Sequence, residues 1–416
     1  MRVLMLSWEY PPVVVGGLGR HVHALARHLA AAGNDVVVLC RQQAGTDAST
    51  HPNTDTVVDG VRVIMVAEDP PHLTFERDLV GWTLAMGHAM VRAGGALLRD
   101  WRPDVVHAHD WLVAHPAIAL AESAGVPLVA TVHATEAGRH SGWLSAPLNQ
   151  QVHSVEWWLA NRADALITCS AAMRAEVAQL FELDADEITV IHNGIEHRNW
   201  RISRSLVRST RAKYAPNGEK LLLFFGRLEW EKGTQDLLAA MPRIRREFPG
   251  TRLIVAGKGR QSAALAEQAR KLRIRRAVEF VGHLPDDELI ATLSAADVTV
   301  LPSRYEPFGI AALEAAAVSA PLVASSAGGL AEVVVDGKTG LSFTPGKIDE
   351  LVTAVCSVLA DPAAARRRAR AGKTRLAGEF DWTHIARSTA AVYSAAEISE
   401  HTTFARPKIP TGNIFC

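Results

Sequence analysis

The stretch VTVLPSRYEPFGIAALEAAAV, residues 298–318, contains the pattern that decides the fold. A short run of β-branched and apolar residues ends at Leu301, a loop with two prolines and a glycine follows, and an alanine-rich segment from Ala311 to Val318 favours a helix. A strand that leads into a helix through a loop is the repeating unit of a parallel sheet covered by helices. The stretch therefore predicts an α/β fold.

The same alternation of strand and helix patterns extends along the chain in both directions. After the first candidate strand, Leu18, Val22, Leu25 and Leu29 are spaced as on one buried face of a helix. We predict strands in the first half at residues 3–6, 35–40, 62–66, 104–109, 128–133, 165–170 and 188–192. Those of the second half are predicted at residues 221–226, 252–256, 277–281, 298–301 and 321–325, with 340–343 as a further candidate.

A segment without periodicity separates the two sets of strands. Residues 196–218 are rich in Arg and Ser and end in turn-forming residues, so we predict a linker there. The chain then contains two doubly wound, Rossmann-like domains, at residues 1–195 and 219–380. Because ligands of such sheets bind at the carboxyl ends of the strands, a ligand shared by both domains would lie in a cleft between them. Residues 400–416 show no period, and we predict that they are disordered.

Composition excludes several classes of function. Hydrophobic residues make up 48% of the 416 residues and charged residues 21%, which is typical of a soluble globular protein. Lys plus Arg and Asp plus Glu are equal at 44 each, so no overall charge favours nucleic acid or an anionic membrane. The arginines at 366–368 and 370 are interpreted as a solvated helix face. Without a signal peptide, a spanning segment or a disulfide framework, the chain is predicted to be cytoplasmic.

Glu306 and Glu314 lie on either side of the predicted start of the helix in the opening stretch. The N-terminus of a helix presents unpaired N–H groups and partial positive charge, which suit an anionic or hydroxyl-rich ligand. Carboxylates accept hydrogen bonds from sugar hydroxyls. The alternative is that Glu306 is a cap and Glu314 a solvated helix residue, because this spacing alone is common.

The loop after the first strand of each predicted domain contains ligand-binding candidates. Gly16 and Gly17 would let a ligand approach the backbone closely, although the pattern G-x-G-x-x-G is absent and a plain loop is the alternative. Arg227 and Lys232 follow strand 221–226, where two cations can neutralise a diphosphate without a metal. Solvation at the surface is the alternative for both cations.

Polar residues also end two neighbouring strands of the first domain. His107, His109 and Asp110 end strand 104–109, and His133 ends strand 128–133. None of the familiar ligand spacings accompanies these histidines, so we expect them to line a cleft and expect no metal site. The absence of the G-x-S-x-G and G-x4-G-K-[ST] patterns argues against a serine hydrolase and a P-loop enzyme.

Taken together, these features resemble the retaining family 4 glycosyltransferases, which have the GT-B fold. The resemblance covers Met1 to about Ala396 and rests on an ordered set of elements: the Gly-rich first loop, His109-Asp110, His133, Asn193-Gly194, Gly226-Arg227 with Lys232, and Glu306 to Glu314. Residues 7–12, 107–115 and 133–143 are similar to the α-1,4-glucosyltransferases of glycogen and methylglucose lipopolysaccharide assembly in mycobacteria.

The resemblance implies donor-binding roles in the second domain. Arg227 and Lys232 would bind the donor diphosphate, with help from the backbone amides of Gly16 and Gly17. Glu314 would accept hydrogen bonds from the ribose. Glu306 would bind the donor glucose together with three backbone N–H groups, those of Phe308, Gly309 and Ile310.

The resemblance also implies roles for residues around the reacting carbon and the base. His133 would lie beside the anomeric centre and Asp110 near the acceptor. The base would rest on backbone near His283 and Leu284. A last helix at about residues 381–398 would return to the first domain.

The activity implied is retaining transfer of glucose from UDP-glucose or ADP-glucose to the 4-hydroxyl of an α-1,4-glucan or a glucosylated glycolipid, without a metal or other cofactor. Three alternatives stay open: a GDP-mannose-dependent α-mannosyltransferase, a nicotinamide-dependent dehydrogenase and a non-catalytic sugar-nucleotide sensor. The sequence does not determine the donor base, the acceptor length or the oligomeric state.

Overall fold

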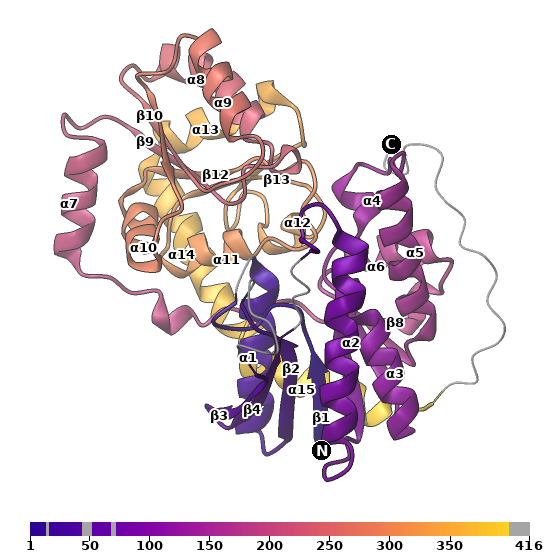
Figure 1. Cartoon of the computed structure of the whole chain (residues 1–416). Helices are drawn as coiled ribbons and strands as arrows, with labels where there is room; N and C mark the ends of the chain where they lie inside the picture. The colour runs from indigo at the N-terminus through magenta and orange to yellow at the C-terminus, as the bar shows by residue number, and fades with distance from the viewer. Residues whose placement is uncertain (14–15, 44–51, 68–71, 399–416) are drawn as a thin grey trace. The chain divides into compact units, whose positions relative to one another are not determined.

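The computed structural model describes residues 1–13, 16–43, 52–67 and 72–398 (Figure 1). The chain divides into two compact units. Unit 1 contains Met1–Asn193 and the segment that begins at Trp382, and unit 2 contains Gly194–Asp381. The predicted disordered tail at 400–416 lies outside the described residues.

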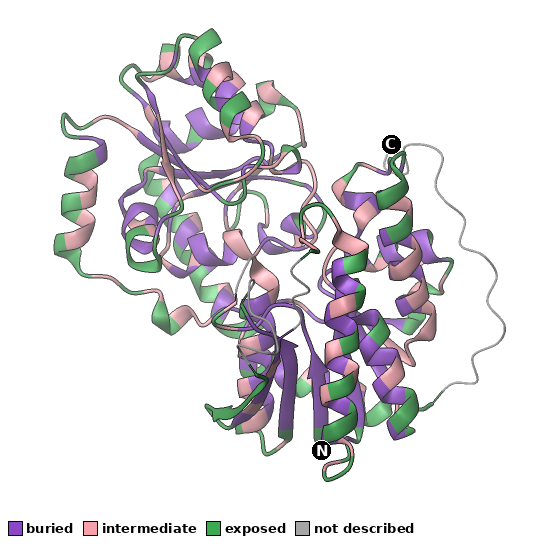
Figure 2. Cartoon of the chain, in the orientation of Figure 1, coloured by how far each residue is buried: buried purple, intermediate pink, exposed green. Residues whose placement is uncertain are grey.

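Unit 1 is built on a sheet with strand order β3-β4-β2-β1-β5-β6-β7-β8. Its strands are β1 (Arg2–Leu6), β2 (Asp35–Arg41), β3 (Thr54–Val58), β4 (Val61–Val66), β5 (Val105–His109), β6 (Leu128–Val132), β7 (Ala165–Thr168) and β8 (Ile188–Val190). All neighbours pair in parallel except β3 and β4. Each strand predicted in this half is present. β3 was missed because all of its residues are exposed and leave no hydrophobic pattern (Figure 2).

Helices cover both faces of this sheet (Figure 1). One face carries α1 (Gly17–Ala31) and α15 (Trp382–Ala395), which pack against each other. The other face carries α2 (Leu79–Leu97), α3 (Ala114–Ala124), α5 (Pro147–Arg162) and α6 (Ala171–Phe181). Shorter helices are η1 (Trp111–Val113), α4 (Glu136–Arg139) and η2 (Ala185–Glu187). Val22, Leu25 and Leu29 of α1 are buried, as their spacing predicts.

The last helix, α15, is an integral part of unit 1. Tyr393 is buried, and its hydroxyl lies 2.7 Å from Nδ1 of His107 on β5. At the other end of α15, the ring of Trp382 contacts those of His21 and His28 on α1. The predicted return of the final helix to the first domain is therefore observed, with the helix beginning at Trp382.

Unit 2 contains a fully parallel sheet with strand order β11-β10-β9-β12-β13-β14. Its strands are β9 (Leu221–Phe225), β10 (Arg252–Ala256), β11 (Val278–Gly282), β12 (Val298–Leu301), β13 (Leu322–Ser325) and β14 (Leu341–Phe343). One face carries α8 (Thr234–Glu247), α9 (Ser262–Lys271) and α13 (Ile348–Ala360). The other carries α7 (Arg204–Tyr214), α10 (Asp286–Ala295), α11 (Ile310–Ala317) and α14 (Pro362–Glu379). The short helices are η3 (His197–Asn199), η4 (Trp230–Lys232) and α12 (Leu330–Val333).

The predicted linker at residues 196–218 is wrong, because that segment is folded and belongs to unit 2. Ser203 caps α7 by accepting a hydrogen bond from the N–H of Leu206, and α7 packs on α10. Arg211 forms an ion pair with Asp297 at 2.8 Å. Tyr214 is the one buried residue of α7, and the helix is so rich in Arg and Ser that its sequence resembles a polar linker.

The sequence predicted a solvated arginine face on one helix and no membrane-spanning segment. The side chains of Arg366, Arg367 and Arg370 are exposed on α14, which agrees with a solvated helix face. No helix of the described part of the chain is long and apolar enough to cross a membrane.

Two adjacent glycines of α2 provide a test of the packing between α2 and α3. A Cβ atom at Gly94 would lie 2.5 and 2.7 Å from the two methyl groups of the buried Leu120, whereas at Gly95 it would meet nothing within 4 Å. We expect Gly95→Ala to stabilise the protein by about 0.5–1 kcal/mol through helix propensity. Gly94→Ala should instead destabilise it by about 1 kcal/mol or more, because the extra methyl overpacks the interface. Urea unfolding measures both, and equal midpoints for the two variants would contradict this packing.

Candidate functional site

The carboxyl ends of β9 and β12, which are neighbours in unit 2, carry an ion pair. Nζ of Lys232, at the end of η4, lies 2.9 Å from Oε2 of Glu306 in the loop before α11. The hydroxyl of Ser303 donates to the same carboxylate oxygen at 3.2 Å. The side chains of Lys232 and Glu306 are 18% and 15% exposed, so the pair is partly shielded from water. The structure thus brings together two residues that the sequence assigned to one ligand.

Glycines fix the backbone around this pair. Gly233 ends η4 with a φ of 70°, and a Cβ atom there would lie 1.7 Å from the carbonyl oxygen of Pro302. On the other side, the N–H of Gly329 donates to the carbonyl of Glu306 at 3.0 Å. Since a side chain at residue 233 would push these loops apart, glycine is required for Lys232 to reach Glu306.

Arg227 is paired with a different carboxylate. Its guanidinium lies 3.0 Å from Oε1 of Glu231, and the Arg227 side chain is 52% exposed. The backbone carbonyl of Glu231 accepts hydrogen bonds from the N–H groups of Arg304 and Tyr305, which ties this loop to the segment that contains Glu306. The guanidinium is therefore half exposed to solvent, while the carboxylate that it contacts is buried.

Sequence reasoning missed a second arginine–carboxylate pair in the same loops. Arg304 donates two hydrogen bonds, each of 2.8 Å, to the buried carboxylate of Asp236 at the start of α8. Its guanidinium also lies over the ring of Trp230, 4.8 Å from the ring centroid. This bidentate contact links the loop after β12 to α8. No local sequence motif predicts this pair, because Arg304 and Asp236 are 68 positions apart in the sequence.

The N-terminus of α11 lies where the sequence placed it. Gly309 caps the helix with a φ of 109°, and a Cβ atom there would lie 2.6 Å from a methyl of Leu330. Phe308 is buried and Ile310 is the first helical residue. Glu314 is buried in the second turn, so it is not the solvated helix residue of the alternative interpretation.

The loops after β10 and β11 complete this edge of the sheet. His283 is exposed and Leu284 is buried after β11, and the N–H of Gly257 donates to the carbonyl of Gly282 at 2.7 Å. A Cβ atom at Gly257 would lie 1.8 Å from the carbonyl oxygen of Gly226, and one at Gly259 would lie 2.3 Å from that of Leu228. The sequence analysis did not single out this loop, although two glycines directly after a strand are a detectable signal.

In unit 1, Asp110 and His133 lie at the carboxyl ends of β5 and β6. The carboxylate of Asp110 accepts a hydrogen bond from the backbone N–H of His133 at 2.7 Å. Burial raises the pKa of Asp110 to about 6, against the lowering effects of Arg139 and of hydrogen bonds from His133 and Ala134. Asp110 itself has a φ of 63°, an uncommon conformation for a residue with a side chain.

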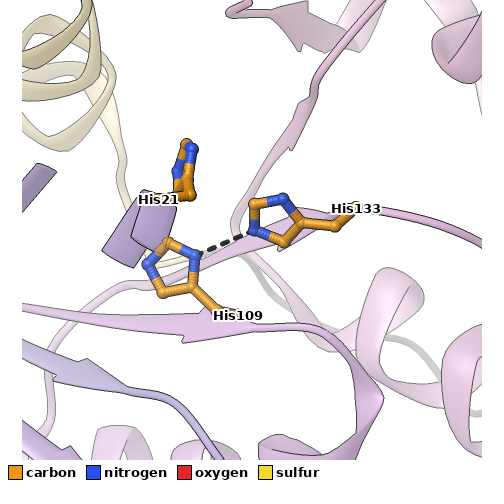
Figure 3. Close-up of side chains that lie close together, drawn as sticks. All are labelled: His21, His109 and His133. Carbon is orange, nitrogen blue, oxygen red and sulfur yellow. Dashed lines mark hydrogen bonds between the residues drawn. The ribbon is translucent and has the colours of Figure 1, made fainter. Parts of the chain in front are cut away.

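Three histidines meet beside these strand ends (Figure 3). Nδ1 of His109 lies 3.1 Å from Nε2 of His133, and the ring of His21, from α1, lies 4.7 Å from that of His133 between centroids. Burial lowers the pKa of His133 to about 3 and the pKa values of His21 and His109 well below the usual range. The rings are therefore neutral at pH 7. The sequence analysis missed His21, which is 88 positions before His109 in the sequence.

The start of α1 already has an anionic partner. The N–H of Gly16 donates to the carboxylate of Glu9 at 2.9 Å, and Glu9 is buried. Gly17 is the first residue of α1. A carboxylate at a helix N-terminus occupies the position that suits a phosphate. The predicted role of Gly16 as a ligand for phosphate thus requires exchange with Glu9.

A buried acid supports the segment that follows His133. Both carboxyl oxygens of Glu156, on α5, accept a hydrogen bond from the N–H of Glu136, at 2.8 and 3.1 Å. Thr135 caps α4 by accepting from the N–H of Gly138. Burial raises the pKa of Glu156 well above its usual range, and the negative charges of Glu136 and Asp110 add to this effect.

Comparison with known families gives two matches along the chain. The family model described as Glycosyltransferase Family 4 matches residues 15–199. The model described as Glycosyl transferases group 1 matches residues 208–375. Together they span both units.

Individual relatives extend over nearly the full length. The chain is 57% identical to the glycogen synthase of Mycobacterium tuberculosis over 99% of its own length and 98% of the relative. It is 34% identical to the alpha-maltose-1-phosphate synthase of Mycolicibacterium smegmatis, over 94% and 99% of the two chains.

Solved structures agree in fold. The sucrose-phosphate synthase of Thermosynechococcus elongatus superimposes with a TM-score of 0.79 at 25% identity, covering 95% of this chain and 98% of that one. Anabaena HepE, solved in complex with UDP-glucose, gives a TM-score of 0.75 at 22% identity, over 95% and 100% of the chains. With the two sheets described above, these matches confirm the predicted GT-B fold class.

The buried acid gives a prediction about pH. A carboxyl whose pKa is higher in the folded state than its ordinary value of 4.5 stabilises the fold fully below that value, and its contribution is lost as pH rises toward the folded pKa. Glu156→Gln mimics the protonated form at every pH. We therefore expect the free energy of unfolding of Glu156→Gln, relative to the unmodified protein, to increase with pH above 5 by up to about 1.4 kcal/mol per pH unit.

Urea unfolding at several pH values measures this difference, with the exposed Glu187→Gln as a control for which we expect no such trend. A difference for Glu156→Gln that stays constant from pH 5 to 8 would show that this carboxyl does not retain its proton.

Proposed function

The chain belongs to the family 4 glycosyltransferases, and we propose that it transfers glucose from a nucleoside diphosphate glucose to the 4-hydroxyl of an α-1,4-glucan with retention of configuration. The observation that carries the proposal is the Lys232–Glu306 pair at the carboxyl ends of β9 and β12. It places a cation for a phosphate beside an acceptor for sugar hydroxyls. The 57% identity to a glycogen synthase over nearly the full chain supports the glucosyl and glucan specificity.

Donor binding would exchange ion pairs. The diphosphate replaces Glu306 as the partner of Lys232 and replaces Glu231 as the partner of Arg227. Glu306 then accepts hydrogen bonds from the hydroxyls of the donor glucose. When the bond between the sugar and the phosphate breaks, the leaving diphosphate gains negative charge, and fixed cations stabilise that charge most where water is excluded. Because these cations belong to the protein, the proposed reaction uses no metal.

The remaining donor contacts are proposed for the loops around the pair. Glu314 accepts from the ribose hydroxyls, and the base rests on the backbone near His283 and Leu284. Three backbone amides at the start of α11 contact the sugar: those of Phe308, Gly309 and Ile310. Recognition of the base by backbone leaves its identity open between uracil and adenine, and the UDP-glucose complex of HepE makes UDP-glucose the first donor to test.

Unit 1 is assigned the reacting carbon and the acceptor. We assign His133 to the anomeric centre and Asp110 to the acceptor, while Gly16 and Gly17 contribute backbone amides to the diphosphate. Attack on the face that the diphosphate leaves preserves configuration: the acceptor oxygen bonds to the anomeric carbon, the bond to the phosphate oxygen breaks, and that oxygen takes the acceptor's proton. No carboxylate nucleophile is needed in this step. A neutral His133 next to the carbon adds no positive charge to an oxocarbenium-like transition state.

The substrate assignment predicts the outcome of a donor and acceptor panel. Purified protein is incubated with UDP-glucose, ADP-glucose or GDP-mannose and with maltooligosaccharides or glucose 1-phosphate, and products are identified by mass and linkage analysis. We expect longer α-1,4-linked oligosaccharides from UDP-glucose or ADP-glucose. Products from GDP-mannose alone would establish the mannosyltransferase alternative, and formation only of α-maltose 1-phosphate would overturn the glucan acceptor.

The same panel separates the other classes of function. Donor binding without any transfer would identify a sugar-nucleotide sensor. A separate titration with NADH, in which the fluorescence of NADH reports binding, tests the dehydrogenase alternative. Binding of NADH would favour that alternative.

The diphosphate assignment predicts the effect of removing Lys232. Lys232→Ala should lower turnover at least tenfold, because one cation that stabilises the leaving group is lost. Lys338→Ala, which removes an exposed lysine from the same unit, is the matched control and should retain full turnover. Circular dichroism and the urea midpoint check that both variants are folded. Near-normal turnover of Lys232→Ala would contradict the assignment.

A further inference from the structure

The three histidines of unit 1 come from three separate elements and converge on one point. His21 lies on α1, His109 ends β5 and His133 follows β6. Each offers one ring nitrogen, and these nitrogens lie within 4.8 Å of one another. Figure 3 shows the rings of His109 and His133 meeting edge to edge, with His21 beside them. The expectation of no metal site rested on the spacing of histidines within short stretches of sequence. That spacing cannot reveal a cluster whose members are distant in the sequence and meet only in the fold.

One nitrogen of this cluster is buried without a partner. Nδ1 of His21 forms no hydrogen bond within the described part of the chain. A buried polar atom without a hydrogen bond destabilises a fold by about 1–3 kcal/mol. Such atoms are expected at a site that holds a ligand, which supplies the missing interactions.

The charge balance around the cluster bears on metal binding. Neutral imidazole is the form that binds metal ions, and burial disfavours a bare dication. The buried carboxylate of Asp110, next to His109 in sequence and bonded to the backbone of His133, offsets part of that charge.

The geometry is close to that of a three-histidine zinc site. Zinc binds histidine nitrogens at about 2.0–2.1 Å in a tetrahedron, which places these nitrogens about 3.4 Å apart. Nδ1 of His109 and Nε2 of His133 already lie 3.1 Å apart. The third nitrogen, from His21, lies within 4.8 Å of the other two, so a bound ion would draw it closer. Three histidines leave the fourth position to water, as in open zinc sites.

We propose that His21, His109 and His133 form a binding site for Zn²⁺, or for another divalent transition metal that prefers imidazole, and that the bound ion inhibits glucosyl transfer. Inhibition follows because the metal holds the ring of His133 and makes its nitrogen unavailable to the sugar. The binding part of the proposal is independent of the proposed function. The inhibition part rests on it.

Binding is tested with Zn²⁺ by titration calorimetry on the full chain, without an affinity tag and after treatment with a chelator. We expect one ion per chain and binding at least tenfold weaker in His21→Gln and in His109→Gln. His88→Gln, which removes an exposed histidine of α2, is the matched control and should bind like the unmodified protein. Circular dichroism and urea unfolding show whether each variant is folded.

Co²⁺ provides a second readout, because a tetrahedral site gives a visible absorption band that an octahedral surface site lacks. We expect this band in the unmodified protein and in His88→Gln, and its loss in His21→Gln. Absence of stoichiometric binding, or equal binding by His21→Gln and the unmodified protein, would overturn the site.

Inhibition is tested as the ratio of transfer rates with and without Zn²⁺ for each variant. We expect the rate with Zn²⁺ to be at most one tenth of the rate without it in the unmodified protein and in His88→Gln. In His21→Gln the two rates should be nearly equal. Metal binding at these histidines without inhibition would overturn the inhibitory role alone. If no sugar is transferred under any condition, calorimetry and the Co²⁺ spectrum still decide the site, so failure of the proposed function is distinguishable.

Discussion

Parallel pairing of β9 with β12 is the constraint on which the candidate site of unit 2 depends. When neighbouring strands run in the same direction, the loops that follow them lie at the same edge of the sheet. Lys232 and Glu306 are 74 residues apart in the chain and meet at that edge with their charged atoms 2.9 Å apart. The same constraint acts in unit 1, where β5 and β6 deliver His109 and His133 to one edge.

The two units present different electrostatic environments at these edges. In unit 2 the charged groups are partly exposed and each cation is paired with a carboxylate, an arrangement that a diphosphate can enter by exchanging partners. In unit 1 the histidines are buried, and burial keeps them neutral. A charged leaving group and an uncharged sugar make different demands, and the proposed assignment gives the first to unit 2 and the second to unit 1.

Much of the fold was predictable because buried strands and amphipathic helices leave periodic patterns, and the loop between Leu301 and Ala311 is an example. β3 and α7 were not, since the first is exposed along its whole length and the second buries one residue. At the site, residue types and strand ends pointed to Lys232 and Glu306. Which cation pairs with which carboxylate depends on loop geometry, and the approach of His21 depends on the packing of α1. Neither leaves a local signal in the sequence.

The central claim is that the Lys232–Glu306 pair opens to receive the donor diphosphate, and a crystal structure with a bound nucleoside diphosphate sugar tests it most directly. The account predicts that Nζ of Lys232 leaves Glu306 and contacts a phosphate oxygen, while Glu306 contacts a hydroxyl of the sugar. A diphosphate bound elsewhere, with the Lys232–Glu306 ion pair intact, would contradict it.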